Sequence, residues 1–78
     1  MPAKRVVLYS TANCAHCRRA KDFLREQGIP FRELDVSRSP RARKELARLG
    51  ARGVPVLLIG DARMDGFDPK RFMRLYRG

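Results

Sequence analysis

Short apolar runs alternate along this chain with segments whose apolar residues recur every three or four positions. The runs cover residues 6–10 and 56–59, and a third, with polar residues interspersed, covers residues 31–36. β-Branched and apolar residues without polar alternation indicate strands that are covered on both faces. We therefore predict three strands here. The tight-turn signal Gly60-Asp61 predicts that residues 62–65 fold back antiparallel as a short edge strand.

Three segments show the periodicity of amphipathic helices. The first is predicted from about Cys14 to Gln27, and Gly28 fits the left-handed residue that follows a helix. The second follows the cap-and-proline signal Ser39-Pro40, and the third follows the same signal at Asp68-Pro69. The inward face of the first helix is predicted to carry Ala20, Phe23, Leu24 and Gln27.

The predicted order of elements is β-α-β-α-β-β-α, which places the chain in the α/β class. The first strand, first helix and second strand suggest a right-handed unit with two parallel strands. The economical architecture is a central four-stranded mixed sheet flanked by three helices. With 78 residues and no linker, repeat or low-complexity segment, the chain is predicted to form a single domain over residues 1–78.

The only two cysteines, Cys14 and Cys17, stand where the first strand ends and the first helix begins. Free backbone N–H groups and the positive end of the helix dipole favour an anion there, and Arg18, Arg19 and Lys21 add positive potential. We therefore predict that Cys14 is a nucleophilic thiolate. One helical turn brings Cys17 back beneath it, as a more buried thiol that resolves a mixed disulfide formed at Cys14.

Two structural explanations compete with redox chemistry at this pair. The first is a structural pair: the helix-start position argues against inert buried thiols, and a disulfide would close so short a loop that it would add only about 2 kcal/mol. The second is a zinc site, which needs four ligands, whereas His16 is the only histidine. We therefore expect reversible thiol–disulfide chemistry and no bound metal.

Two further positions have both a structural and a functional interpretation. Val54-Pro55 precedes the third strand, where a proline that lacks an N–H is tolerated. From the residues alone a trans bond is expected, because only about 5% of X–Pro bonds are cis. Asp68 fits a helix cap, while the same helix start, after Gly66, also suits the binding of a substrate carboxylate.

The formal net charge of +10 is high for this length. It fits a nucleic-acid partner, an acidic protein partner or a solvated arginine-rich surface. The basic cluster on and around the second helix has no interleaved aromatic residue, so no nucleic-acid partner is expected. We predict a solvated face, with docking of an acidic partner as the alternative. The cluster consists of Arg38, Arg41, Arg43, Lys44, Arg48 and Arg52.

Five segments, in this order and spacing, resemble the glutaredoxins, and the similarity covers nearly the whole chain. The resemblance implies a thioredoxin fold and dithiol–disulfide exchange, in which Cys14 attacks and Cys17 resolves. It also implies a cis Val54–Pro55 bond that faces the active cysteine. The five segments are Tyr9-Ser10, Cys14-Ala15-His16-Cys17, Arg18-Arg19-Ala20-Lys21, Val54-Pro55 and Gly66-Phe67-Asp68.

The same resemblance implies a binding site for glutathione. The tripeptide backbone would lie along Val54, its γ-glutamyl end would meet Phe67 and Asp68, and its glycine carboxylate would meet Arg52. The chain departs from the usual family pattern in two places: Thr11 stands where lysine is common, and Ala15-His16 stands where a proline–tyrosine pair is common. The implied substrate- or glutathione-binding positions, including these two departures, are Thr11, His16, Arg52, Val54, Pro55, Gly66, Phe67 and Asp68.

The electron source stays open at this point. The Gly66-Phe67 pair also resembles the glutaredoxin-like electron donors of ribonucleotide reductase, which are recharged by thioredoxin reductase. We expect an oxidoreductase that reduces disulfide-containing proteins or glutathione mixed disulfides, with no bound cofactor. Glutathione is a candidate co-substrate, and glutathione or thioredoxin reductase would supply the electrons. The alternative is a basic non-catalytic binding module or adaptor that docks an acidic partner.

No apolar stretch approaches the length of a secretory core or a membrane span. We therefore expect a cytoplasmic protein with no membrane contact, where the thiols stay reduced between catalytic cycles. We expect it to be a monomer.

Overall fold

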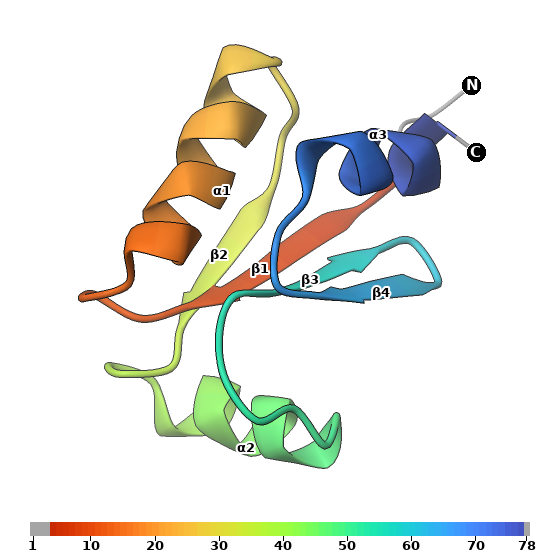
Figure 1. Cartoon of the computed structure of the whole chain (residues 1–78). Coiled ribbons are helices and arrows are strands. Elements are labelled where there is room, and N and C mark those ends of the chain that lie inside the picture. The colour runs from red at the N-terminus through yellow and green to blue at the C-terminus, as the bar shows by residue number, and fades with distance from the viewer. Residues whose placement is uncertain (1–3, 78) are drawn as a thin grey trace.

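In the computed structural model, which describes residues 4–77, four strands and three helices follow one another in the predicted order (Figure 1). The order β-α-β-α-β-β-α and the α/β class are therefore confirmed. The strands are β1 (Val6–Ser10), β2 (Arg32–Asp35), β3 (Val56–Ile59) and β4 (Ala62–Asp65). The helices are α1 (Ala15–Glu26), α2 (Pro40–Arg48) and α3 (Pro69–Arg77).

The strands form one mixed sheet in the order β2-β1-β3-β4. The parallel β1–β2 pair and the antiparallel β3–β4 pair are as predicted, and β1 also pairs with β3, antiparallel. Tyr9 lies opposite Val56, and Val56 lies opposite Asp65. This register brings the end of β1, the start of β3 and the end of β4 to the same end of the sheet.

Helices cover both faces of the sheet, with α1 and α3 on one side and α2 on the other (Figure 1). Alternate residues of β1 explain why its run is apolar throughout. Leu8 packs in the core cluster that contains Leu24 of α1 and Phe72 of α3. Tyr9 packs in the second cluster, with Leu46 of α2. The sheet is thus covered on both faces, as a strand without polar alternation requires.

Two predicted details differ in the structure. The second strand is shorter than residues 31–36 and comprises only Arg32–Asp35. Gln27, predicted on the inward face of the first helix, is exposed at the C-cap, and Ile29 is buried instead. The cause is the left-handed Gly28, with φ +66°, which turns the chain back so that the N–H of Ile29 bonds to the carbonyl of Leu24 at 2.9 Å.

The surface of the described chain is strongly cationic. All six residues of the basic cluster are exposed, as the prediction of a solvated face requires. Within residues 4–77, none of the helices has the length and apolar character needed to cross a membrane.

Candidate active site

Cys14 caps the N-terminus of α1. Its backbone is extended, with φ −125° and ψ 109°, and its Sγ accepts a hydrogen bond from the backbone N–H of Cys17 at 3.1 Å. Its carbonyl oxygen accepts the N–H of Arg18 at 3.1 Å. The N-terminus of a helix stabilises negative charge on the side chain that caps it. The half-buried Cys14 sulfur therefore occupies a position that suits a thiolate within reach of solvent.

Cys17 lies beneath Cys14, and only 1% of its surface is exposed. Burial raises the pKa of the Cys17 thiol to about 11, and hydrogen bonding to Cys14 adds to the rise. A backbone hydrogen bond at Thr11 and the charge of Lys21 oppose it. Both cysteines are free thiols in the structure. The pair therefore consists of an outer sulfur that a disulfide can reach and an inner sulfur that is protonated at neutral pH.

A second segment reaches the same end of the sheet just before β3. The Val54–Pro55 peptide bond is cis, as the family resemblance implied and against the expectation from base rates. Pro55 is fully buried, and its carbonyl oxygen accepts the N–H of Gly66 at 2.8 Å. Gly66 adopts φ +84°, a left-handed conformation that favours glycine. This hydrogen bond joins the Val54-Pro55 segment to Gly66, just before the start of α3.

The other predicted binding residues differ in how they are held. Val54 is half-buried and packs against the α2 core cluster, whereas Arg52 is exposed. The ring of Phe67 lies 5.4 Å from that of Phe23, so it belongs to the aromatic core beneath α3. A carboxylate oxygen of Asp68 accepts the N–H of Lys70 at 3.2 Å, which supports its role at the start of α3.

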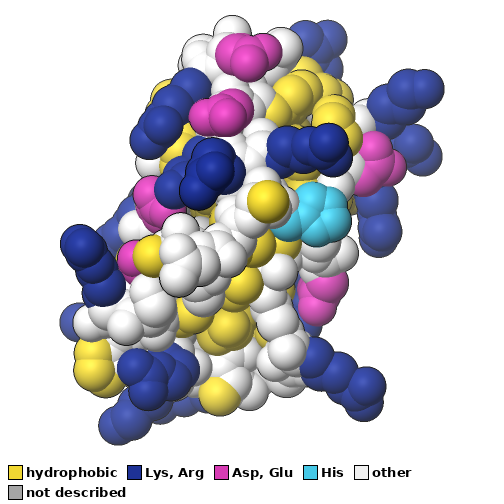
Figure 2. Space-filling view, turned by 60° about the vertical axis from the view of Figure 1, so that its left-hand side comes forward, with side chains coloured by type: hydrophobic (Ala, Val, Ile, Leu, Met, Phe, Trp, Pro, Cys, Tyr) yellow, Lys and Arg dark blue, Asp and Glu magenta, His cyan; other side chains and the backbone are white. Residues whose placement is uncertain are grey.

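His16 is exposed on the face that Figure 2 presents, where the histidine lies among lysine and arginine side chains. With Ala15 and Arg19 it lines a concavity of about 280 Å³. A larger concavity, of about 840 Å³, lies between α1 and α3 and contains neither cysteine. Within residues 4–77, no group of three or more His, Cys, Asp or Glu side chains is arranged to hold a metal ion. Of the two cysteines, Cys14 is therefore the one that solvent reaches, while Cys17 is buried behind it.

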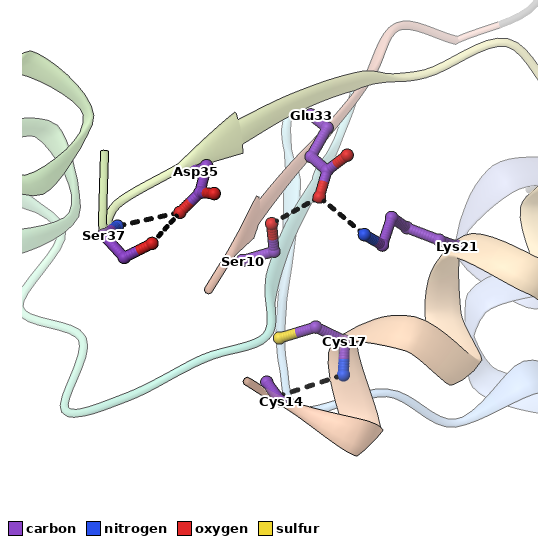
Figure 3. A network of polar contacts seen from close by, with 7 residues as sticks. All are labelled: Ser10, Cys14, Cys17, Lys21, Glu33, Asp35 and Ser37. Carbon is purple, nitrogen blue, oxygen red and sulfur yellow. Dashed lines mark hydrogen bonds and ion pairs between the residues drawn. The ribbon is translucent and has the colours of Figure 1, made fainter. Parts of the chain in front are cut away.

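A polar network beside the cysteines was missed at the sequence level (Figure 3). Ser10 donates its hydroxyl hydrogen to Glu33 at 2.7 Å, and the ammonium of Lys21 lies 3.0 Å from the same oxygen. From the sequence, Lys21 is expected only to add positive potential near the cysteines. Its position four residues after Cys17 is a helical signal that could have placed it one turn beyond that thiol. Finding Glu33 requires the parallel register of β1 and β2 as well.

The chain is similar to known proteins in both amino-acid sequence and three-dimensional structure. A family model described as Glutaredoxin matches residues 6–63. A glutaredoxin of Pseudomonas aeruginosa is 42% identical over 64 residues, which are 81% of this chain and 76% of that protein. The glutaredoxin-like protein NrdH of Escherichia coli is 32% identical over 72 residues, which are 92% of this chain and 89% of that protein.

The spatial comparison agrees with the sequence comparison. The solved structure of NrdH-redoxin from Escherichia coli matches with a TM-score of 0.82 at 32% identity. The match covers 91% of this chain and 93% of that chain. The predicted thioredoxin fold, with its four-stranded mixed sheet and three helices in the described residues, is therefore confirmed.

Proposed function

The chain belongs to the glutaredoxin family, and from this we propose that it reduces protein disulfides or glutathione mixed disulfides by dithiol exchange. Its relatives support thiol–disulfide oxidoreductase activity in general terms. The observation that carries the specific proposal is the hydrogen bond from the N–H of Cys17 to the Sγ of Cys14. That contact holds the outer sulfur at the N-terminus of α1 while the inner sulfur waits beneath it.

In the first step, the Cys14 thiolate attacks one sulfur of the substrate disulfide. A new bond forms between Cys14 and that sulfur, the substrate S–S bond breaks, and the second substrate sulfur leaves as a thiolate that takes up a proton. The half-exposed position of Cys14 supports its role as the attacking group. The free N–H groups at the start of α1 stabilise the negative charge before attack.

In the second step, Cys17 loses its proton and attacks the sulfur of Cys14. A Cys14–Cys17 disulfide forms, and the bond between Cys14 and the substrate breaks. The electron pair leaves with the substrate sulfur, which takes up a proton. The raised pKa of Cys17, about 11, supports this order, because the inner thiol is protonated and unreactive until the mixed disulfide is in place.

The substrate is proposed to lie along the segments that converge beside the cysteines. The backbone of Val54, next to the cis bond to Pro55, would pair with an extended substrate strand. For glutathione, the exposed Arg52 would meet the glycine carboxylate, and the start of α3 at Phe67 and Asp68 would meet the γ-glutamyl end. The hydrogen bond between Gly66 and Pro55 supports this arrangement, since it holds the two segments together.

The electron source is proposed to be glutathione or thioredoxin reductase. The Pseudomonas aeruginosa relative is named a glutaredoxin, whereas the solved Escherichia coli relative is described as having a thioredoxin-like activity profile. Thr11 and His16 are two of the three residues, with Ala15, at which the chain departs from the usual glutaredoxin pattern. They are therefore the positions at which specificity for one reductant would be decided.

NADPH oxidation tests both parts of the proposal. The wild-type protein is coupled in parallel to glutathione with glutathione reductase and to thioredoxin reductase, with insulin or a glutathionylated peptide as substrate. Activity is expected with at least one system. Cys14→Ser is expected to lose it by three orders of magnitude or more (on the order of the losses seen when a nucleophile is removed). Cys17→Ser is expected to form a mixed disulfide that mass spectrometry detects.

Lys44→Gln is the matched control, because it removes one exposed charge from α2 without altering either cysteine. Its rate is expected to equal that of the wild type. A Cys14→Ser variant that kept the wild-type rate would disprove the proposal. An inert wild type in both coupled systems would favour the non-catalytic binding module instead.

A further inference from the structure

The network beside the cysteines ties three elements together. Lys21 of α1 and Ser10 at the end of β1 both contact Oε2 of Glu33 on β2, at 3.0 Å and 2.7 Å. Ser10 has no exposed surface, and the side chains of Lys21 and Glu33 are 24% and 31% exposed. Figure 3 shows the Cys17 side chain extending from α1 toward the strand end that carries Ser10. Lys21 is four residues after Cys17, so the two side chains project from neighbouring turns on one face of α1, and Glu33 holds the ammonium in place there.

The resolving step needs a group that favours the thiolate of Cys17. Burial raises the pKa of this thiol, and the hydrogen bond and charge of Cys14 raise it further. When Cys14 is bonded to a substrate sulfur, it carries no charge, so its part of the rise disappears. The two influences that still lower the pKa are the backbone hydrogen bond at Thr11 and the charge of Lys21. Of these two, only Lys21 acts through its side chain, so only its effect can be removed by a substitution.

We propose that Lys21, held by Glu33 and Ser10, is a positioning residue for the resolving step and favours the attacking thiolate of Cys17. This inference rests on the proposed function, because it concerns the second step of that exchange. The bonds that form and break are those of the second step above. The proton of Cys17 passes to solvent, the Cys14–Cys17 bond forms, and the substrate sulfur leaves with the electron pair and is protonated.

The groups around Cys17 have both signs of charge. Cys14 caps the same helix, Lys21 lies on it, and the backbone of Thr11 follows β1. From β2, Glu33 pairs with Lys21, and Asp35 acts on Glu33. The charge of Glu33 disfavours a nearby thiolate. Its Oε2, however, is occupied by Ser10 and Lys21, and these contacts compensate its charge. Glu33 thus fixes the position of the Lys21 ammonium on the turn of α1 that follows Cys17.

An ion pair that merely tethers α1 to β2 would have the same geometry, so the test must measure the resolving step itself. One equivalent of dithiobis(nitrobenzoate), an aromatic disulfide that releases a yellow thiolate, is mixed with the reduced protein in a stopped-flow instrument. Attack by Cys14 releases the first thiolate. With no excess reagent, a second is released only when Cys17 attacks the mixed disulfide. The rate of this second phase is then measured across pH.

Lys21→Gln is expected to slow the second phase at pH 7 about three- to tenfold, which corresponds to raising the pKa of Cys17 in the mixed disulfide by about half a unit to one unit. The first phase should change by less than twofold. Lys21→Arg keeps the charge and should restore the second phase. Lys44→Gln, which removes a charge from α2, should leave both phases unchanged. Ser10→Ala, which changes no charge, should give a smaller shift in the same direction.

A second phase with an unchanged pH midpoint in Lys21→Gln would overturn the inference, even if the variant were less stable to urea. An equal shift in Lys44→Gln would also overturn it, because the effect would then reflect net charge alone. If the wild type released the first thiolate but never the second, Cys17 would not resolve, and the proposed function would fail together with this inference. A wild type with both phases therefore separates the two failures.

Discussion

The backbone N–H of Cys17 donates a hydrogen bond to the Sγ of Cys14 across 3.1 Å. The side chain of the outer cysteine thus caps the helix on which the inner cysteine lies, and neither partner in this contact is a side chain of residue 15 or 16. Departures from the usual family dipeptide at Ala15-His16 therefore leave the geometry of the sulfur pair intact. They alter the exposed surface beside it instead.

The two cysteines are expected to react with iodoacetamide at very different rates at pH 7. Cys17 is 1% exposed, and a pKa of about 11 leaves only about one thiolate in ten thousand at this pH. Cys14 should therefore be alkylated first, as peptide mapping by mass spectrometry would show. In urea both should be modified at similar rates. Alkylation of Cys17 ahead of Cys14 in the folded protein would contradict the assigned roles.

Glu33 is expected to stabilise the fold only above mildly acidic pH. Burial raises its pKa, but the hydrogen bond from Ser10 and the contact with Lys21 outweigh this, so its pKa lies below the ordinary value. The stabilisation is complete above the pKa of an unfolded glutamate, about 4.3, and is lost as the pH falls through the folded-state pKa. Glu33→Gln should cost about 1 kcal/mol in the free energy of unfolding at pH 7.

Urea denaturation at pH 7 and at several values below about pH 4 checks this pH dependence. The difference between wild type and Glu33→Gln should shrink toward zero as the pH falls. Glu26→Gln, which alters an exposed glutamate of α1, should have little effect at either pH. A difference that grew on acidification would show that the sign is wrong.

Gly66 is expected to be sensitive to substitution because of its backbone and not because of crowding. Its φ is +84°, and an added Cβ would meet no atom within 4 Å. Gly66→Ala should therefore cost about 1–2 kcal/mol in the free energy of unfolding through left-handed strain alone. Gly53→Ala is the matched control, since its surroundings are equally open and its φ lies outside the left-handed region. Equal urea midpoints for the two variants would contradict this explanation.

Substitution of Arg52 tests whether glutathione binds at the proposed position. If its exposed guanidinium binds the glycine carboxylate, Arg52→Gln should raise KM for a glutathionylated peptide about three- to tenfold and leave kcat nearly unchanged. Steady-state kinetics with glutathione and glutathione reductase would measure both constants. Arg48→Gln removes an exposed arginine from α2 and should change neither. Identical KM values for all three proteins would exclude Arg52 from the binding site.

Local patterns in the sequence sufficed to predict the order of the elements and the position of the two cysteines at the start of the first helix. Apolar runs, helical spacing and the signals Ser39-Pro40 and Asp68-Pro69 act over a few residues, so they can be recognised without knowing what packs where. The structure bears them out at α2, whose N-cap is Ser39. The placement of Cys14 at the start of α1 follows from the same short-range rules.

The tertiary structure decided what depends on register and on contacts between distant segments. The cis bond at Val54–Pro55 ran against its base rate, and the residues alone favoured trans. Ile29 is buried in place of Gln27 because the chain turns back after α1 and meets the core. Glu33 reaches Lys21 only because β2 pairs in parallel with β1. The last contact joins residues that no local pattern links, since it forms only when two strands pair across the sheet.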